Sequence, residues 1–151
     1  MQKDSEQKQK AFVASGEQSL LYLINKGYLS RSGLFQTVTP CMRNDAFDET
    51  HMKYFVKLEL MRFSMDEDLN SDGLVIELVD SAQRFFRKHT ASTKVVDTKN
   101  ETGYISYDIM LDDVEIGSYG YRSCRFCNWI YGTGLAEPRF SRMLTLSKRG
   151  D

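Results

Sequence analysis

The chain has 151 residues, of which 41% are hydrophobic and 27% charged, and its formal net charge at pH 7 is −1. This length allows one domain with a real core over residues 1–151 and is too short for a catalytic domain plus a separate recognition domain. The balanced charge provides no global basic field for non-specific nucleic-acid binding. No apolar run approaches a bilayer span, and a polar segment follows Met1, so we expect a cytoplasmic protein without a membrane partner.

Hydrophobic periodicity and turn signals divide the chain into helices and strands. We predict helices near residues 8–26, 72–89 and 138–147. We predict strands near residues 34–43, 52–64, 104–111, 114–122 and 125–131, with a polar turn from Lys94 to Gly103. Because the strand runs follow one another with few strand–helix–strand units, antiparallel pairing is favoured. The predicted fold class is α+β, an antiparallel β-sheet with flanking helices.

The first predicted helix is interrupted near its middle. Phe12, Leu20 and Ile24 recur at helical spacing up to the stop signal at Gly27. Between them, Ser15-Gly16-Glu17-Gln18 breaks the apolar pattern with a glycine, a poor helix residue, and with polar groups. From the residues alone, this segment is either solvated helix surface or the wall of a pocket.

The strand predicted over 52–64 has one mixed face and one purely apolar face. Its period of two places Phe55, Lys57 and Glu59 on the mixed face. Arg43 ends the preceding strand, and His51 lies in the loop between the two strands. A cation, an imidazole and an aromatic ring suit an anionic aromatic ligand, through charge-assisted contacts to phosphate and stacking on a base. The stretch therefore indicates a nucleoside triphosphate site.

Residues 66–73 are similar to a calcium-binding loop, with acidic or amide side chains at alternate positions before Gly73. An EF-hand loop also needs a bidentate glutamate at its twelfth position, which here is Val79, and a helix on the incoming side. Capping of the next helix by Ser71 or Asp72 is the better interpretation. We expect no calcium site here.

The segment Cys124-Arg125-Phe126-Cys127 has the spacing of some zinc and redox sites. A closed zinc site needs four ligands, and only Cys41 remains to join this pair. In one extended strand, a separation of three residues turns the two thiols to opposite faces. We therefore predict reduced structural cysteines and neither a metal site nor a disulfide framework.

The C-terminal part is predicted to run from a strand through a glycine-rich turn into a helix. Gly132-Thr133-Gly134 would form the turn. Pro138 fits the first helical turn, where its missing N–H donor costs nothing. This arrangement presents Arg139 at the opening of the helix.

From about Ala14 to Leu146, the chain resembles the catalytic core of the class II aminoacyl-tRNA synthetases. Motif 2 of that family is similar to Met42-Arg43-Asn44-Asp45, His51, Tyr54-Phe55 and Glu59. The region of similarity does not include a recognisable motif 1 or an anticodon-binding domain. It therefore implies a truncated core reduced to its nucleotide pocket.

The motif 2 resemblance implies a role in ATP binding for four residues. Arg43 would hold the α-phosphate, and His51 would approach the outer phosphates. Phe55 would stack on the adenine. Asp45 would stand in for the family's glutamate near the adenine or the amino group, although its shorter side chain reduces its reach.

Residues 114–118 resemble the Ile-Glu-x-Gly-Ser strand that precedes motif 3 in the same family. The resemblance implies that Glu115 binds the Mg²⁺ that bridges the ATP phosphates, with Asp108 as a weaker second carboxylate and Ser118 on the same ATP-binding strand. The segment that presents Arg139 resembles motif 3. Arg139 would then pack on the adenine face opposite Phe55 and reach the γ-phosphate.

The resemblance implies two alternative functions. The chain is either an ATP-dependent ligase that activates an amino or carboxylic acid as an acyl-adenylate, or a non-catalytic nucleotide-binding or regulatory paralogue. Glu17 and Gln18 are candidates for holding the acid, because several class II enzymes place such residues just before motif 2. A tRNA partner is not supported. Without motif 1, we expect a homodimer that forms through a different contact from the usual one.

Overall fold

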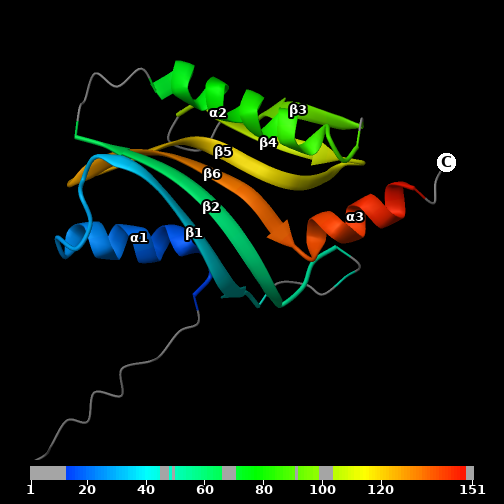
Figure 1. Cartoon of the computed structure of the whole chain (residues 1–151), viewed down its shortest axis with the longest axis horizontal. Helices are drawn as coiled ribbons and strands as arrows, with labels where there is room; N and C mark the ends of the chain where they lie inside the picture. The colour runs from blue at the N-terminus through cyan, green and yellow to red at the C-terminus, as the bar shows by residue number, and fades with distance from the viewer. Residues whose placement is uncertain are drawn as a thin grey trace, which may run out of the picture.

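The structure, a computed structural model, describes residues 13–44, 48, 50–65, 71–90, 92–98 and 104–148. Its centre is a six-stranded antiparallel sheet with the strand order β1-β2-β6-β5-β4-β3 (Figure 1). The predicted α+β class with an antiparallel sheet and flanking helices is confirmed. The elements are α1 (Gly16–Asn25), β1 (Gly33–Met42), β2 (Tyr54–Ser64), α2 (Ser71–Phe86), β3 (Thr93–Asp97), β4 (Ser106–Leu111), β5 (Val114–Cys124), β6 (Cys127–Glu137) and α3 (Arg139–Ser147).

The sheet consists of a hairpin and a meander. β1 and β2 form the hairpin, and β3 to β6 follow one another as neighbours in the meander. β2 pairs with β6 and joins the two parts, with Val56 opposite Glu137 and Phe63 opposite Trp129. The junction between the two parts therefore pairs two strands that are far apart in the sequence.

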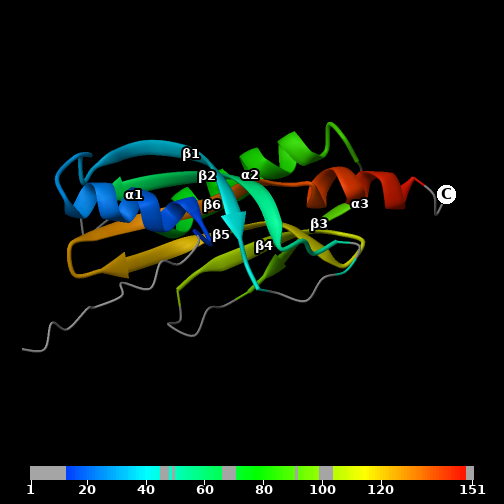
Figure 2. The same cartoon turned by 90° about the horizontal axis from the view of Figure 1, so that it is seen from below.

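The helices cover the two faces of the sheet unequally. α2 contacts β4, β5 and β6, whereas α1 contacts β1 and β2 on the opposite face (Figures 1 and 2). α3 packs against β5 and β6 at one end of the sheet. No helix in the described part of the chain is long and apolar enough to cross a membrane.

Two apolar clusters hold these layers together. The spacing of Val75, Val79 and Phe86 along α2 gives the helix one buried stripe, as an amphipathic helix on a sheet requires. This stripe packs with Ile109, Leu111, Ile116, Tyr119, Ile130, Phe140 and Met143. A second cluster lies beneath α1 and contains Leu20, Ile24, Met61, Phe63, Cys127 and Trp129.

α1 begins later than the predicted start of the first helix. Ser15 is the N-cap, with extended dihedral angles, and its hydroxyl accepts a hydrogen bond from the Glu17 N–H at 3.3 Å. Residues 13–15 are therefore not helical, and residues 8–12 lie outside the described part. The glycine that breaks the apolar pattern is the first helical residue.

The expected turn over 94–103 was wrong in its first part, because β3 occupies Thr93–Asp97 and pairs with β4. Only Thr93 is buried, and the four residues after it are exposed. The strand lies at the edge of the sheet, so its side chains do not alternate between core and solvent. The period of two that predicts a strand is therefore missing.

The expected glycine-rich turn was also wrong. Gly132 and Gly134 lie within β6, which continues to Glu137, and α3 begins at Arg139 after Pro138. A Cβ on Gly132 would lie 2.7 Å from Cδ1 of Tyr119. The glycine is therefore needed for close packing against an aromatic ring inside the sheet.

The two cysteines of the 124–127 segment do not lie in one strand. Cys124 ends β5 and Cys127 begins β6, with a two-residue turn between them, and the two are direct partners across the hairpin. The expectation that their thiols point to opposite faces is therefore wrong, since the chain reverses between them. All three cysteines are free thiols.

Of the segment that is similar to a calcium-binding loop, the structure describes only residues 71–73. Residues 66–70 lie outside the described part, and α2 begins at Ser71, with Asp72 in its first turn. Among the residues that the structure describes, no group of three or more His, Cys, Asp or Glu side chains is placed to hold a metal ion.

Candidate functional site

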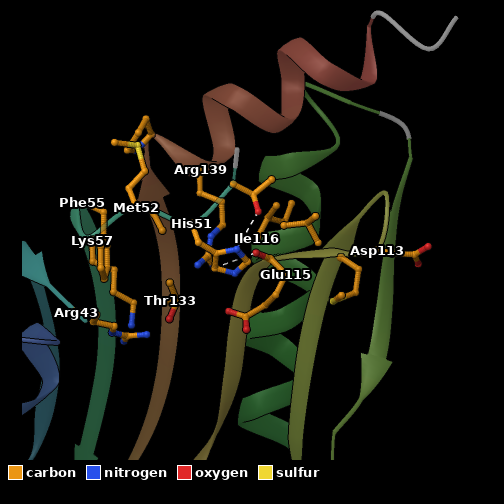
Figure 3. Close-up of a pocket in the computed structure, with 15 residues that line it drawn as sticks. Arg43, His51, Met52, Phe55, Lys57, Asp113, Glu115, Ile116, Thr133 and Arg139 are labelled. Carbon is orange, nitrogen blue, oxygen red and sulfur yellow. Dashed lines mark hydrogen bonds between the residues drawn. The ribbon is translucent and has the colours of Figure 1, made fainter. Parts of the chain in front are cut away.

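A cavity of about 440 Å³, called here the first cavity, opens where the ends of several strands meet the start of α3 (Figure 3). Its walls come from the segments around both ends of the β1–β2 loop, the start of β5 and the end of β6. The lining residues are Arg43, Thr50, His51, Met52, Phe55, Lys57, Met110, Asp113, Val114, Glu115, Ile116, Thr133, Ala136, Pro138 and Arg139.

Arg43 lies directly after β1 and is held in place by both its backbone and its side chain. Its backbone N–H donates to the Lys53 carbonyl at 3.0 Å, across the mouth of the hairpin. Its Nε donates to the Ala14 carbonyl at 3.2 Å, and its guanidinium carbon lies 5.3 Å from the centre of the Phe55 ring. In Figure 3 the side chain extends toward the middle of the cavity, across from Glu115.

His51 is positioned by Asp48 within the β1–β2 loop. The Asp48 carboxylate accepts from the backbone N–H groups of His51 and Thr50, at 2.6 and 2.7 Å, and its Oδ2 lies 2.8 Å from His51 Nδ1. These hydrogen bonds, led by the one from the His51 backbone, hold the pKa of Asp48 far below its ordinary value. The ionised carboxylate therefore accepts a hydrogen bond from Nδ1–H of His51 and fixes the ring orientation at the cavity.

Glu115, at the start of β5, faces the basic side of the cavity (Figure 3). Its pKa is raised above the ordinary value by burial, and the charge of Asp108 raises it further, while Arg139 lowers it. Asp108 lies on β4 opposite Ser118. A carboxylate that is costly to ionise in the free protein gains from a nearby cation, and oxygen donors are the ligands that Mg²⁺ prefers.

Arg139 is placed by the junction between β6 and α3. It is the first residue of α3, and its guanidinium Nη1 donates to the backbone carbonyl of Glu115 at 3.3 Å. This contact ties the start of α3 to the start of β5. Arg139 therefore lines the same side of the cavity as Glu115, the candidate metal ligand.

A second cavity of about 250 Å³ continues from the first, toward the N-terminus of α1. The two share Arg43, Lys57, Glu115 and Thr133. The other residues that line the second cavity are Ser15, Glu17, Glu59, Leu60, Met61, Ser118, Arg122, Tyr131 and Gly132.

Glu17 is held at the second cavity by two donors from the meander. Arg122 Nη1 donates to its Oε2 at 2.5 Å, and the Trp129 indole N–H donates to its Oε1 at 2.7 Å. The Arg122 guanidinium also lies over the Tyr131 ring, 4.0 Å from its centre. Sequence reasoning missed Arg122 and Tyr131 as site residues, although the alternation along β5 places Ser118 and Arg122 on one face.

Glu59 anchors α1 to this site. Its carboxylate accepts from the Ser15 hydroxyl at 2.5 Å, from the backbone N–H of Gly16, and from that of Glu17 at 3.2 Å. Lys57 Nζ donates to it at 3.0 Å. Glu59 is therefore a buried anion at a helix N-terminus, where free backbone donors and the helix dipole favour negative charge.

The predicted site residues divide into four groups. Arg43, His51, Phe55, Glu115 and Arg139 line the first cavity. Glu17 and Ser118 line the second. Gln18 is exposed on α1, and Asp108 lies beside the site; neither lines the two cavities. Asp45 lies outside the described residues.

The sequence matches no protein-family model and no curated protein. The structure is similar to two solved structures of pyrrolysyl-tRNA synthetase from Desulfitobacterium hafniense, each with a TM-score of 0.62, at 13% and 14% sequence identity. Both matches cover 91% of this chain and 50% of the synthetase chain, so the chain spans about half the length of these neighbours. The chain therefore has a class II synthetase-like fold, and the motif assignments stay predictions.

Proposed function

We propose that the first cavity binds ATP with Mg²⁺ and that the chain activates an amino or carboxylic acid as an acyl-adenylate. The observation that carries the proposal is that Arg43, Phe55, Glu115 and Arg139 come from four separate segments and line one cavity. A single strand arginine or phenylalanine is usually surface charge or core. Four such residues around one hollow match what a nucleotide with a metal ion needs.

The cations around the cavity suit the triphosphate. Arg43 is the candidate for the α-phosphate, and His51 and Arg139 are the candidates for the outer phosphates. Charge-assisted hydrogen bonds to phosphate are among the strongest polar contacts in proteins. Phe55 supplies an aromatic face for the base, and a guanidinium plane such as that of Arg139 can stack on the other face of the base.

The carboxylates fit a magnesium site that is completed by the nucleotide. Mg²⁺ is usually held by one or two carboxylates together with substrate phosphates and waters. Glu115 is the first candidate ligand, and Asp108 is the second because it lies on the neighbouring strand β4, opposite Ser118 of β5. When bound, the ion would neutralise phosphate charge and orient the pyrophosphate leaving group.

The second cavity is the proposed place of the acid. Glu17 and Ser118 line it, and Arg43 lines both cavities, at the point where they join. An acid carboxylate there would attack the α-phosphorus, and the bond between the α-phosphorus and the bridging oxygen would break to release pyrophosphate. Arg43 would stabilise the charge that develops on the α-phosphate during this step.

We also propose a homodimer, formed through the face of β1 and β2 opposite α1, beside α2. Leu34, Val38, Tyr54 and Val56 are large hydrophobic side chains exposed there. β1 is also an edge strand of the sheet. A second copy could cover this apolar surface and edge, which soluble proteins usually protect. The cytoplasmic location expected from the sequence stays a prediction.

Calorimetry with ATP and Mg²⁺ tests the binding part of this proposal. Arg139→Ala would remove a phosphate partner and one side of the base stack, together worth on the order of 2–4 kcal/mol, or roughly thirty- to several-hundred-fold in affinity. The matched control is Arg62→Ala, an exposed arginine of β2 on the face opposite Phe55. If the wild type does not bind ATP, or if Arg139→Ala binds as tightly as the wild type, the nucleotide site is misassigned.

Exchange of labelled pyrophosphate into ATP tests the chemical step. The assay is repeated with a panel of amino and carboxylic acids, and exchange that depends on one acid supports adenylate formation. ATP binding without exchange for any acid would instead support the non-catalytic alternative. Arg43→Ala tests the role of Arg43 in this step. The variant should suppress pyrophosphate exchange although circular dichroism shows that it remains folded.

A further inference from the structure

The tip of the β5–β6 hairpin carries two thiols that face each other. Cys124 and Cys127 flank a turn of only two residues, Arg125 and Phe126, and are direct partners in the strand register. Their sulfur atoms lie 3.9 Å apart. This tip lies beside the packing of α1 and belongs to neither cavity of the proposed active site.

The backbone at this pair is suited to a disulfide. Residues directly opposite each other on antiparallel strands have Cα atoms roughly 4.5–5.5 Å apart, within the range of about 4.4–6.8 Å that disulfides span. A bond of about 2.05 Å requires the sulfurs to approach by about 1.9 Å from their 3.9 Å separation, which side-chain rotation can supply. Strand pairing therefore already meets the main geometric requirement for the bond.

The surroundings give the two thiols different roles. Cys127 is 5% exposed and packs with Phe63 and Trp129 beneath α1. Burial, together with the neighbouring Cys124, raises its pKa to about 12, so it rarely ionises by itself. Cys124 is only partly buried. The more accessible thiol is therefore the one that an external reagent reaches first.

The hollow beside the pair is lined by positive charge. Its walls include Arg31 and Arg125 together with both cysteines, over a cavity of about 480 Å³. Guanidinium groups attract carboxylates, so this environment favours a small disulfide that carries carboxylates over a neutral one. Oxidised glutathione is a suitable probe of that class.

We propose that Cys124 and Cys127 form a reversible redox site that a small anionic disulfide oxidises. The Cys124 thiolate attacks one sulfur of the disulfide, forms a mixed disulfide and releases one thiolate. The Cys127 thiol then loses its proton and attacks the Cys124 sulfur, which forms the Cys124–Cys127 bond and releases the second thiolate. Two protein thiols are oxidised, and one external disulfide is reduced to two thiols.

The first experiment equilibrates the full-length protein in glutathione buffers of increasing oxidised fraction. The samples are quenched with acid and alkylated, and the number of alkylated thiols is read from the intact mass. We expect the three cysteines to alkylate under reducing conditions and two to become protected together as the buffer becomes oxidising. If all three remain reactive across the series, or if only disulfide-linked dimers form, the proposal is overturned.

A digest identifies the protected pair. Trypsin cleaves after Arg125, so a Cys124–Cys127 disulfide would join residues 123–125 to residues 126–139 until a reductant separates them. Cys127→Ser should accumulate glutathione on Cys124, whereas Cys41→Ser should form the bond as the wild type does. Loss of protection in Cys41→Ser, or a linked peptide that contains Cys41, would assign the redox site elsewhere. Dithiodipropionate, which carries two carboxylates, and neutral hydroxyethyl disulfide serve as matched oxidants, and faster reaction with the neutral one would contradict the role of Arg31 and Arg125.

Discussion

The two faces of the β1–β2 hairpin invert the usual distribution of polar and apolar residues. On one face, Glu59 is 3% exposed and Lys57 is largely buried. On the opposite face, the hydrophobic side chains of Val38 and Val56 are 67% and 44% exposed. Charged residues are rarely buried in proteins unless they are paired. The buried charged residues of this hairpin therefore belong to the proposed ligand site. The exposed apolar residues of its other face belong to the proposed homodimer contact.

The buried charges are tolerated because each has partners. Glu59 accepts from two backbone N–H groups at the start of α1, from the Ser15 hydroxyl and from Lys57. These donors replace the water that burial removes. If the carboxylate were removed, the donors would be left without an acceptor, and the folded state would be destabilised. The comparison of the two faces can therefore be tested by removing one group from each.

The largest loss of stability is expected for Glu59→Ala. This variant leaves the buried Lys57 charge and the α1 donors without their partner, and breaking a buried ion pair on one side costs about 3–5 kcal/mol. Urea unfolding followed by circular dichroism gives the free energy. Val38→Thr on the opposite face is the control and should change stability by less than about 0.5 kcal/mol. If Glu59→Ala and Val38→Thr lowered the free energy of unfolding equally, the two faces would not differ in their contribution to stability.

A moderate loss is expected for Gly16→Ala. The added Cβ would lie 2.4 Å from Thr37 Cγ2 and 2.8 Å from a Glu59 carboxylate oxygen, so the start of α1 would have to move. Overpacking of this kind costs about 1–3 kcal/mol, measured by the same urea titration.

The chain offers a rescue and a control for this glycine. Thr37→Ser removes the nearest methyl group and should recover part of the lost stability in the Gly16→Ala background. Gln18→Ala, on the exposed side of the same helix, should have an effect below about 0.5 kcal/mol. A Gly16→Ala variant that is as stable as the wild type would show that α1 is not held closely against β1.

A smaller, pH-dependent gain is expected for Glu115→Gln. Because burial raises the pKa of Glu115 in the folded protein, the folded state binds this proton more tightly than the unfolded state does. Stability is therefore lost as the pH rises from about 4.3, the ordinary value for glutamate, toward the raised value. A glutamine cannot ionise, so the variant should gain stability relative to the wild type over that window.

Thermal or urea unfolding of both proteins across this pH range checks the Glu115 prediction. A difference between them that does not change with pH would contradict the buried-carboxylate interpretation. The same variant should bind ATP with Mg²⁺ more weakly, which would separate a role in function from a role in stability.

The smallest effect on folding is expected for Val38→Lys. The side chain at this position is exposed, so the free energy of unfolding of the monomer should change by less than about 0.5 kcal/mol. A lysine at a self-complementary interface would place like charges opposite each other and should shift a homodimer toward monomer. Sedimentation at several concentrations measures this shift. A wild-type protein that stays monomeric at every concentration would rule out the proposed dimer.

Much of the fold could be predicted because most strands follow the simple period of two. β2, β4 and β5 were recognised in this way, and the stripe along α2 predicted its helix. β3 was missed because an edge strand with exposed side chains on both sides does not alternate. The glycines of β6 suggested a turn because the side chains that approach them, Tyr119 at Gly132 and Leu58 at Gly134, come from neighbouring strands.

The candidate site was only partly predictable for a related reason. Resemblance to known motifs identified Arg43, Phe55, Glu115 and Arg139, which the structure brings to one cavity. It did not identify Arg122, whose partner Glu17 is distant in sequence. Polarity alone also cannot distinguish a solvated charge from one held by a helix N-terminus, because the difference depends on tertiary contacts.

The pairing of β2 with β6 has a consequence for how the chain folds. The hairpin carries Arg43 and Phe55, and the meander carries Glu115 with Arg139 after it, so neither part contains a complete cavity. Joining them pairs β2 (Tyr54–Ser64) with β6 (Cys127–Glu137), which are far apart in the sequence, and closing such a long loop costs entropy before its contacts form. Pairings of this kind slow folding. We therefore expect the least local pairing in the sheet, β2 with β6, to limit the folding rate of the domain and to complete the proposed ligand site.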